Sequence, residues 1–195
     1  MSLARYHDGQ RELQDRFETR RLADRLDEVT YAAALGEGHR LLIERADMFF
    51  LATADAQGQP DCSFKGGAPG FVRVLAPDAL AWADEDGNGQ FRSLGNILRN
   101  PHVGLLFVDW QKPSRLRVNG LASVLLDDPL LAEYPGAKSI VRLAIEQVFP
   151  NCPRYLPRMQ QTDASPYWRA SGATAPRPGW KDDPRFRDAL PESDR

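Results

Sequence analysis

From Met48 onward, short apolar runs alternate with turn-forming residues, and this spacing is typical of antiparallel strands. Six strands are predicted, at residues 49–54, 60–65, 71–75, 80–83, 102–110 and 115–126. A further strand is predicted at residues 139–149, after those six. The pattern predicts a mainly β protein, a small closed or split β-barrel with flanking helices, because closure of a sheet removes exposed edges. We therefore expect a six-stranded antiparallel split barrel.

Helical periodicity flanks and interrupts the strands. Residues 10–35 and 37–46 carry apolar side chains at helical spacing, and a short helix is predicted at residues 90–98, ending at Asn100-Pro101. The chain is accordingly divided into an N-terminal helical extension (1–46), a split-barrel domain (47–160) and a proline-rich C-terminal tail (161–195).

Composition excludes several classes of function. The chain has 25 Lys and Arg residues against 27 Asp and Glu residues, so no basic excess favours nucleic acid. The longest apolar run, Met48 to Ala52, is far shorter than the ~20 residues that cross a bilayer, and the N-terminus lacks the apolar centre of a signal peptide. We expect a cytoplasmic protein without a membrane partner. Cys62 and Cys152 form no zinc or redox motif, and no metal site is expected.

Motifs for hydrolases, metalloproteases and P-loop enzymes are missing from the sequence. The segment Gly87-Asn88-Gly89-Gln90-Phe91-Arg92 approaches a dinucleotide-binding fingerprint. Arg92 stands at the third glycine position, however, and the neighbouring units are hairpins. The sequence therefore argues against a Rossmann domain.

The same glycine-rich loop has a simpler chemical use. It leads into a predicted helix, and free backbone N–H groups at such a junction favour an anion. Arg92 and Ser93 would add a guanidinium and a hydroxyl, with Asn88 nearby. The alternative, which these residues alone favour, is an ordinary loop with a solvated arginine.

Two further segments have the polarity of ligand sites. Ser63-Phe64-Lys65-Gly66-Gly67 places a hydroxyl and an ammonium at a strand end, with glycines that allow a planar ring to approach. The alternative is a hairpin whose lysine protects an edge. Arg117 and Asn119 share one face of a later strand, as on any half-exposed strand.

Taken together, these segments carry a resemblance. The resemblance rests on eight segments: Phe-Leu-Ala-Thr at 50–53, Gly-Gln-Pro-Asp at 58–61, Ser-Phe-Lys-Gly-Gly at 63–67, Gly-Phe-Val-Arg-Val at 70–74, Gly87-Asn88, Ser-Leu-x-Asn-Ile-Leu-x-Asn-Pro at 93–101, Val-Gly-Leu-Leu-Phe at 103–107 and Leu-Arg-Val-Asn-Gly at 116–120. Over residues 45–160 the chain resembles the FMN-binding split-barrel family of pyridoxamine 5′-phosphate oxidase. Cys152-Pro-Arg-Tyr155 resembles its flavin-nucleotide-binding branch.

The resemblance implies a homodimer with FMN at the subunit interface. It implies a phosphate held by Lys65, Arg92 and Ser93, and a flavin ring along residues 71–74. The full implied cofactor-binding set is Ser63, Lys65, Gly66, Phe71, Val72, Arg73, Val74, Asn88, Arg92, Ser93, Asn96, Arg117 and Trp168. The oxidase itself has an Arg-Lys pair where Arg92-Ser93 stands here, and its C-terminal Arg and His pattern has no match, so pyridoxamine phosphate is not the expected substrate.

The resulting hypothesis is an FMN-dependent oxidoreductase acting on a small-molecule substrate. No catalytic acid or base is identified, because hydride transfer to a flavin needs none that the sequence exposes. Two alternatives stay open: a non-catalytic flavin carrier or sensor, and a split barrel that binds haem or a deazaflavin. For Trp168 in the tail, the alternatives are packing on its own barrel and stacking on the partner's flavin.

Overall fold

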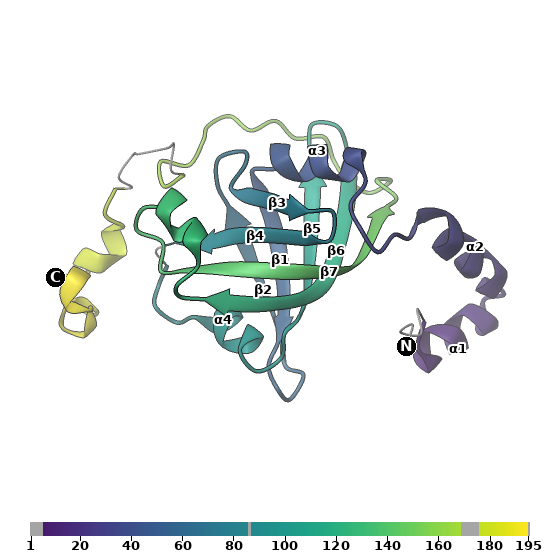
Figure 1. Ribbon diagram of the computed structural model, residues 1–195, viewed down its shortest axis with the longest axis horizontal. Coiled ribbons are helices and arrows are strands. Elements are labelled where there is room, and N and C mark those ends of the chain that lie inside the picture. Colours follow the sequence, from purple (N-terminus) through teal and green to yellow (C-terminus); the bar gives the residue numbers. More distant parts are fainter. Residues whose placement is uncertain (1–5, 86, 169–175, 195) are drawn as a thin grey trace.

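One antiparallel sheet of seven strands forms the body of the molecule, in the order β2-β1-β5-β6-β7-β4-β3 (Figure 1). The computed structural model describes residues 6–85, 87–168 and 176–194. The strands are β1 (Met48–Ala54), β2 (Pro60–Gly66), β3 (Val72–Ala76), β4 (Ala79–Asp84), β5 (His102–Asp109), β6 (Ser114–Leu125) and β7 (Ser139–Asn151). The sheet is that of a split barrel, as the sequence predicts.

The prediction of six strands is wrong by one. β7 belongs to the sheet and lies between β4 and β6, pairing Ala79 with Ala144 and Leu125 with Ile140. Without it, β4 and β6 would each leave a row of backbone groups unpaired, which a buried sheet does not tolerate. The strand nearest the C-terminus therefore completes the barrel.

Four α-helices accompany the sheet within the described residues: α1 (Asp8–Arg16), α2 (Arg20–Thr30), α3 (Glu37–Arg45) and α4 (Arg92–Ile97). Short 3-10 helices follow at Pro129–Glu133, Gly179–Asp182, Arg187–Ala189 and Glu192–Asp194. α3 contributes the fully buried Ile43 to the core. α4 packs on β1, β2 and β6 through Leu94 and Ile97.

The core follows from alternation along the strands. On β1, Phe49, Leu51 and Thr53 are buried while their neighbours face outward. The Phe49 ring lies 5.3 Å from both Trp82 and Phe107, measured between ring centroids. This aromatic cluster joins β1, β4 and β5 at the centre of the barrel.

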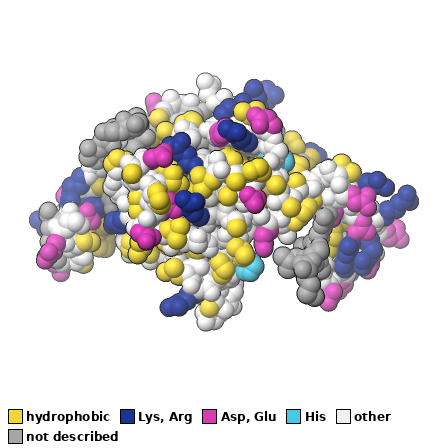
Figure 2. All heavy atoms as spheres, in the orientation of Figure 1, with side chains coloured by type: hydrophobic (Ala, Val, Ile, Leu, Met, Phe, Trp, Pro, Cys, Tyr) yellow, Lys and Arg dark blue, Asp and Glu magenta, His cyan; other side chains and the backbone are white. Residues whose placement is uncertain are grey.

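The N-terminal arm, defined here as α1 and α2, extends away from the sheet (Figure 1). Neither helix buries a residue. Basic and acidic side chains gather on this arm (Figure 2), and they form pairs such as Arg11 with Asp24 at 2.7 Å. Directly after α2 the chain contacts the barrel through the backbone bridge between Ala32 and Val148 and through Tyr31 Oη, which donates to Glu146 O at 3.1 Å. The division of the chain at residues 46 and 160 stays a prediction.

Among the described residues, no helix has the length and apolar character needed to cross a membrane.

Candidate functional site

Strand β2 presents two chemically different faces. Its pairing with β1 sets Ser63 opposite Leu51 and Lys65 opposite Phe49. Paired residues in a sheet point to the same side, so Ser63 and Lys65 face the side on which the core lies. Phe64 and Gly66, which alternate with these residues along β2, belong to the outer face.

A pocket of about 290 Å³, here called the polar pocket, lies where the inner face of β2 meets the start of α4. Its lining combines three cationic side chains, three carboxylates and two hydroxyls: Lys65, Arg92, Lys138, Asp61, Asp84, Glu85, Ser63 and Ser93. The loop residues 87–91 close one side. Five of the predicted cofactor residues, Ser63, Lys65, Asn88, Arg92 and Ser93, are thus brought together.

The two serines fix the geometry of the polar pocket. Their Oγ atoms lie 3.0 Å apart, although 30 residues separate them in sequence. Ser93 is only 5% exposed, and its hydroxyl also donates to Asp61 Oδ2 at 3.3 Å. Arg92 Nε donates to Gln90 Oε1 at 3.0 Å, which holds the guanidinium near the loop. A ligand with several acceptor oxygens would find converging donors here.

Among the carboxyl groups of the polar pocket, Asp84 has a raised pKa. Burial raises the pKa of the Asp84 carboxyl, although the ammonium groups of Lys65 and Lys138 act in the opposite direction. The carboxyl therefore gives up its proton less readily than an exposed aspartate does. This property reduces its repulsion toward an anion as the pH falls.

Asn96 lies on α4 but outside the polar pocket lining. Its Nδ2 donates to Thr53 Oγ1 at 3.0 Å, so the side chain ties α4 to β1.

The four predicted residues at 71–74 lie around β3. The Phe71 ring stacks on Phe49 at 5.8 Å, and Val72 is buried in the core with Val74 packed against it. Arg73 forms an ion pair with Glu133 at 2.6 Å. None of the four residues lines the polar pocket. Their proposed contact with a flavin ring stays a prediction.

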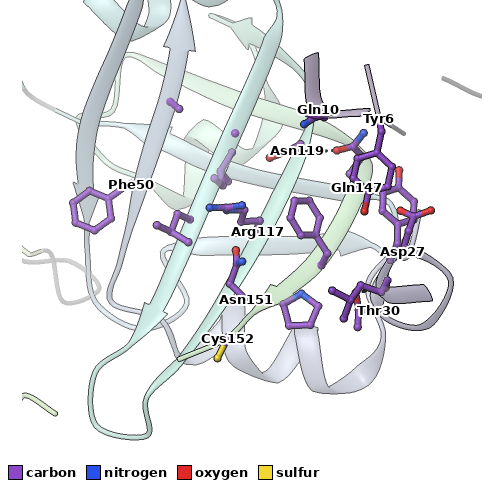
Figure 3. A pocket seen from close by; sticks show the side chains of 18 of the residues that line it. Tyr6, Gln10, Asp27, Thr30, Phe50, Arg117, Asn119, Gln147, Asn151 and Cys152 are labelled. Atoms are coloured by element: carbon purple, nitrogen blue, oxygen red, sulfur yellow. Dashed lines mark hydrogen bonds between the residues drawn. The ribbon is translucent and has the colours of Figure 1, made fainter. Parts of the chain in front are cut away.

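Arg117 lies in another pocket, here called the outer-face pocket, between the outside of the sheet and the N-terminal arm (Figure 3). The pocket measures about 1060 Å³. The Arg117 guanidinium lies 5.8 Å from the centre of the Phe149 ring, and Asn119 Nδ2 donates to Gln147 Oε1 at 3.1 Å. Gln147 and Phe149 were missed from the sequence, because only the β6–β7 pairing brings them beside Arg117 and Asn119.

The outer-face pocket also contains both cysteines of the chain, Cys62 and Cys152, each exposed. A hydrogen bond from the backbone N–H of Arg154 lowers the pKa of the Cys152 thiol, and the guanidinium groups of Arg154 and Arg115 act in the same direction.

Trp168 and Gly66 meet on the outer side of β2. A Cβ atom at position 66 would lie 3.3 Å from Trp168 Nε1. Trp168 also lines a third pocket of about 710 Å³, here called the aromatic hollow, together with Phe64, Trp110, Met48 and Met159. The structure thus places Trp168 against β2 of its own chain.

Sequence reasoning also missed Asp84 and Lys138 in the polar pocket. Both belong to segments that carry no motif, and they reach the pocket because Lys138 N donates to Asp84 O at 3.1 Å. Within residues 6–85, 87–168 and 176–194, no group of three or more His, Cys, Asp or Glu side chains is arranged to hold a metal ion.

Comparison with known proteins finds relatives of the central part of the chain. A family model described as pyridoxamine 5′-phosphate oxidase matches residues 35–160. A solved protein from Lactobacillus delbrueckii, described as a candidate pyridoxamine 5′-phosphate oxidase, is 30% identical with a TM-score of 0.50, covering 62% of this chain and 99% of that one. HupZ from Group A Streptococcus is 21% identical with a TM-score of 0.50, covering 60% and 98%, and this likeness concerns the fold. No curated protein matches the sequence.

Proposed function

Because the chain belongs to the pyridoxamine 5′-phosphate oxidase family, we propose that it binds FMN and acts as a flavin-dependent oxidoreductase on a small molecule. One observation carries the proposal: Ser63, Lys65, Arg92 and Ser93, which are distant in sequence, line one pocket. Hydroxyl, ammonium and guanidinium groups are the donors that a terminal phosphate requires.

The polar pocket fits the phosphate end of FMN in chemistry and in size. Its volume of about 290 Å³ suits that end of the cofactor, so the remainder would extend beyond the pocket. The three carboxylates oppose an anion, and Asp84 does so less than usual because burial raises its pKa. Lys65, Arg92 and Lys138 supply the compensating positive charge.

In this proposal the protein binds and orients the cofactor. Lys65 and Arg92 neutralise the phosphate, while the buried Ser93 hydroxyl, held next to Ser63, fixes its position. When bound, FMN supplies hydride transfer, and the protein determines which molecule reaches it. No side chain of the polar pocket is assigned as an acid or base.

The proposed functional unit contains two copies of the chain. On the outer face of the sheet, Phe50 of β1 is paired with Leu106 of β5, and both side chains are only partly buried. An apolar sheet face of this kind supports association through a two-fold axis. We therefore propose a homodimer with FMN near the subunit interface.

The decisive experiment compares two flavins that differ only in the phosphate. Arg92→Ala removes a charge-assisted contact of about 1.5–3 kcal/mol, so FMN affinity should fall about 10- to 100-fold. Riboflavin affinity should stay nearly unchanged. Arg99→Ala is the matched control, because Arg99 follows α4 but does not line the polar pocket. Equal losses for both flavins would refute the phosphate assignment.

The absorption spectrum of the purified protein tests the cofactor itself. FMN, haem and a deazaflavin have different visible spectra, and mass analysis of the group released on denaturation identifies it directly. An NAD(P)H oxidation assay then distinguishes an enzyme from a carrier or sensor. A haem spectrum without flavin would overturn the proposal.

A further inference from the structure

We propose that the aromatic hollow is a binding site for an uncharged planar aromatic molecule, separate from the polar pocket. The two sites lie on opposite faces of β2, since Ser63 and Lys65 line one and Phe64 lines the other. The inference does not depend on which cofactor the polar pocket holds.

The construction of the hollow fits a small molecule. Its walls come from the end of α3, the start of β1, the β5–β6 turn and the C-terminal segment 159–168. Its volume of about 710 Å³ lies within the range of roughly 300–1,000 Å³ typical of small-molecule sites. Met159 N donates to Trp110 O at 3.1 Å, which holds the C-terminal segment over the hollow.

The lining selects an aromatic ligand. Phe64, Trp110 and Trp168 offer three rings, and Met48 and Met159 add two thioethers. Aromatic rings and thioether sulfurs both make favourable contacts with a planar π system. Phe64 is 57% exposed and Met159 is 51% exposed, so a ligand would cover apolar surface that the chain alone leaves in water.

Gly66 allows the aromatic wall to form. A Cβ atom there would lie 2.7 Å from Phe64 Cε1 and 3.3 Å from Trp168 Nε1. The first distance is shorter than a van der Waals contact, so a side chain at this position would push the Phe64 ring away. A hydrogen at position 66 therefore lets both rings lie against the strand.

One polar group gives the hollow a preference among aromatic molecules. Trp110 Nε1 donates to Met48 Sδ at 3.4 Å, and a thioether sulfur is a weak acceptor. A ligand oxygen would be a stronger acceptor for the indole N–H. The rim carries two cations, Arg45 and Lys112, against three carboxylates, Asp47, Asp109 and Asp163, so it does not favour an anion. An uncharged aromatic alcohol, phenol or quinone fits this chemistry.

Calorimetric titration of the full-length protein with 2-naphthol tests the proposal. Decahydro-2-naphthol, which keeps the hydroxyl but is saturated and not planar, is the matched ligand. We expect 2-naphthol to bind at least several-fold more tightly than the saturated alcohol. Equal affinities, or no binding of 2-naphthol, would overturn the proposal.

Three variants locate the bound probe. Trp168→Ala should weaken 2-naphthol about 2- to 10-fold through loss of an aromatic contact, and Trp168→Phe should recover part of the affinity. Gly66→Ala should weaken it as well, because it displaces Phe64. Trp180→Ala is the control, since Trp180 packs on Phe186 at 6.2 Å and does not line the hollow. An effect of Trp180→Ala as large as that of Trp168→Ala would overturn the assignment.

Repeating the titration at saturating FMN separates this proposal from that of the previous section. We expect 2-naphthol affinity to change less than about twofold. Displacement of 2-naphthol by FMN would overturn the separate site, because the hollow would then hold the flavin ring. Failure of FMN to bind at all would refute the proposed function and leave the 2-naphthol result standing.

Discussion

The two faces of β2 are built from neighbouring residues and have opposite chemistry. Ser63 and Lys65 face a pocket of mixed charges and hydroxyls, whereas Phe64 and Gly66 face aromatic rings and thioethers. A strand alternates its side chains with a period of two, so four residues suffice to serve both sites. One short strand therefore contributes side chains to two pockets of different chemistry.

The largest expected effect is a loss of unfolding free energy, and it separates the barrel core from the two faces of β2. Phe49→Ala removes a fully buried ring that contacts Trp82 and Phe107, so unfolding free energy should fall by about 3–5 kcal/mol. Phe64→Ala removes a ring that is 57% exposed, and the loss should stay below about 1 kcal/mol. Urea unfolding measures both. Similar losses would mean that Phe64 supports the fold rather than a ligand.

Lys65 tests the polar face by itself. Lys65→Ala removes a positive charge from the polar pocket, and FMN affinity should fall about 10-fold or more, from a charge-assisted contact of about 1.5–3 kcal/mol. Affinity for 2-naphthol should remain within about twofold. A parallel loss of both ligands would indicate that the variant disturbs β2 as a whole.

Ser63→Ala should have a smaller effect on the same face. The substitution removes the hydroxyl that lies 3.0 Å from Ser93 Oγ. A neutral hydrogen bond contributes about 0.5–1.5 kcal/mol, so FMN affinity should fall about 2- to 10-fold. Fluorescence titration with FMN and riboflavin measures the difference. A loss larger than that of Lys65→Ala would reverse the proposed ranking of the two contacts.

The smallest expected effect is the pH dependence of stability that Asp84 causes. Its pKa in the folded protein is raised by burial, so the folded state holds the proton more tightly than the unfolded chain does. Stability should therefore rise as the pH falls through the folded-state pKa, and level off below the ordinary pKa of aspartate. Asp84→Asn should be more stable than the parent at neutral pH, with the difference shrinking in acid. A difference that does not vary with pH would contradict this account.

Much of the fold could be predicted from local pattern. The apolar run at residues 49–54 predicted most of β1, and the turn residues marked the hairpins. The place of β7 could not be read in this way, because its pairing with β4 joins Ala79 to Ala144 across most of the domain. The local sequence of a strand does not show which distant strands it will pair with, and so it did not show that β7 pairs with β4 and β6.

The candidate site shows the same limit at the level of single residues. Ser63, Lys65, Arg92 and Ser93 were identified from their segments and do line one pocket. Asp84 and Lys138 were missed because β4 and the segment before β7 bring them there only after the sheet has formed. The contribution of Asp84 and Lys138 to the charge of the pocket therefore became visible in the structure alone.

The late position of β7 has a consequence for how the chain folds during synthesis. β4 and β6 receive their shared neighbour only when residues 139–151 have been made, so the emerging chain carries two strands with open edges. Pairings of such wide sequence separation slow folding, and open edges invite association with other chains. Truncation before residue 139 should therefore give an aggregating product rather than a smaller barrel, and a ribosome-bound chain of that length should be a target for chaperones.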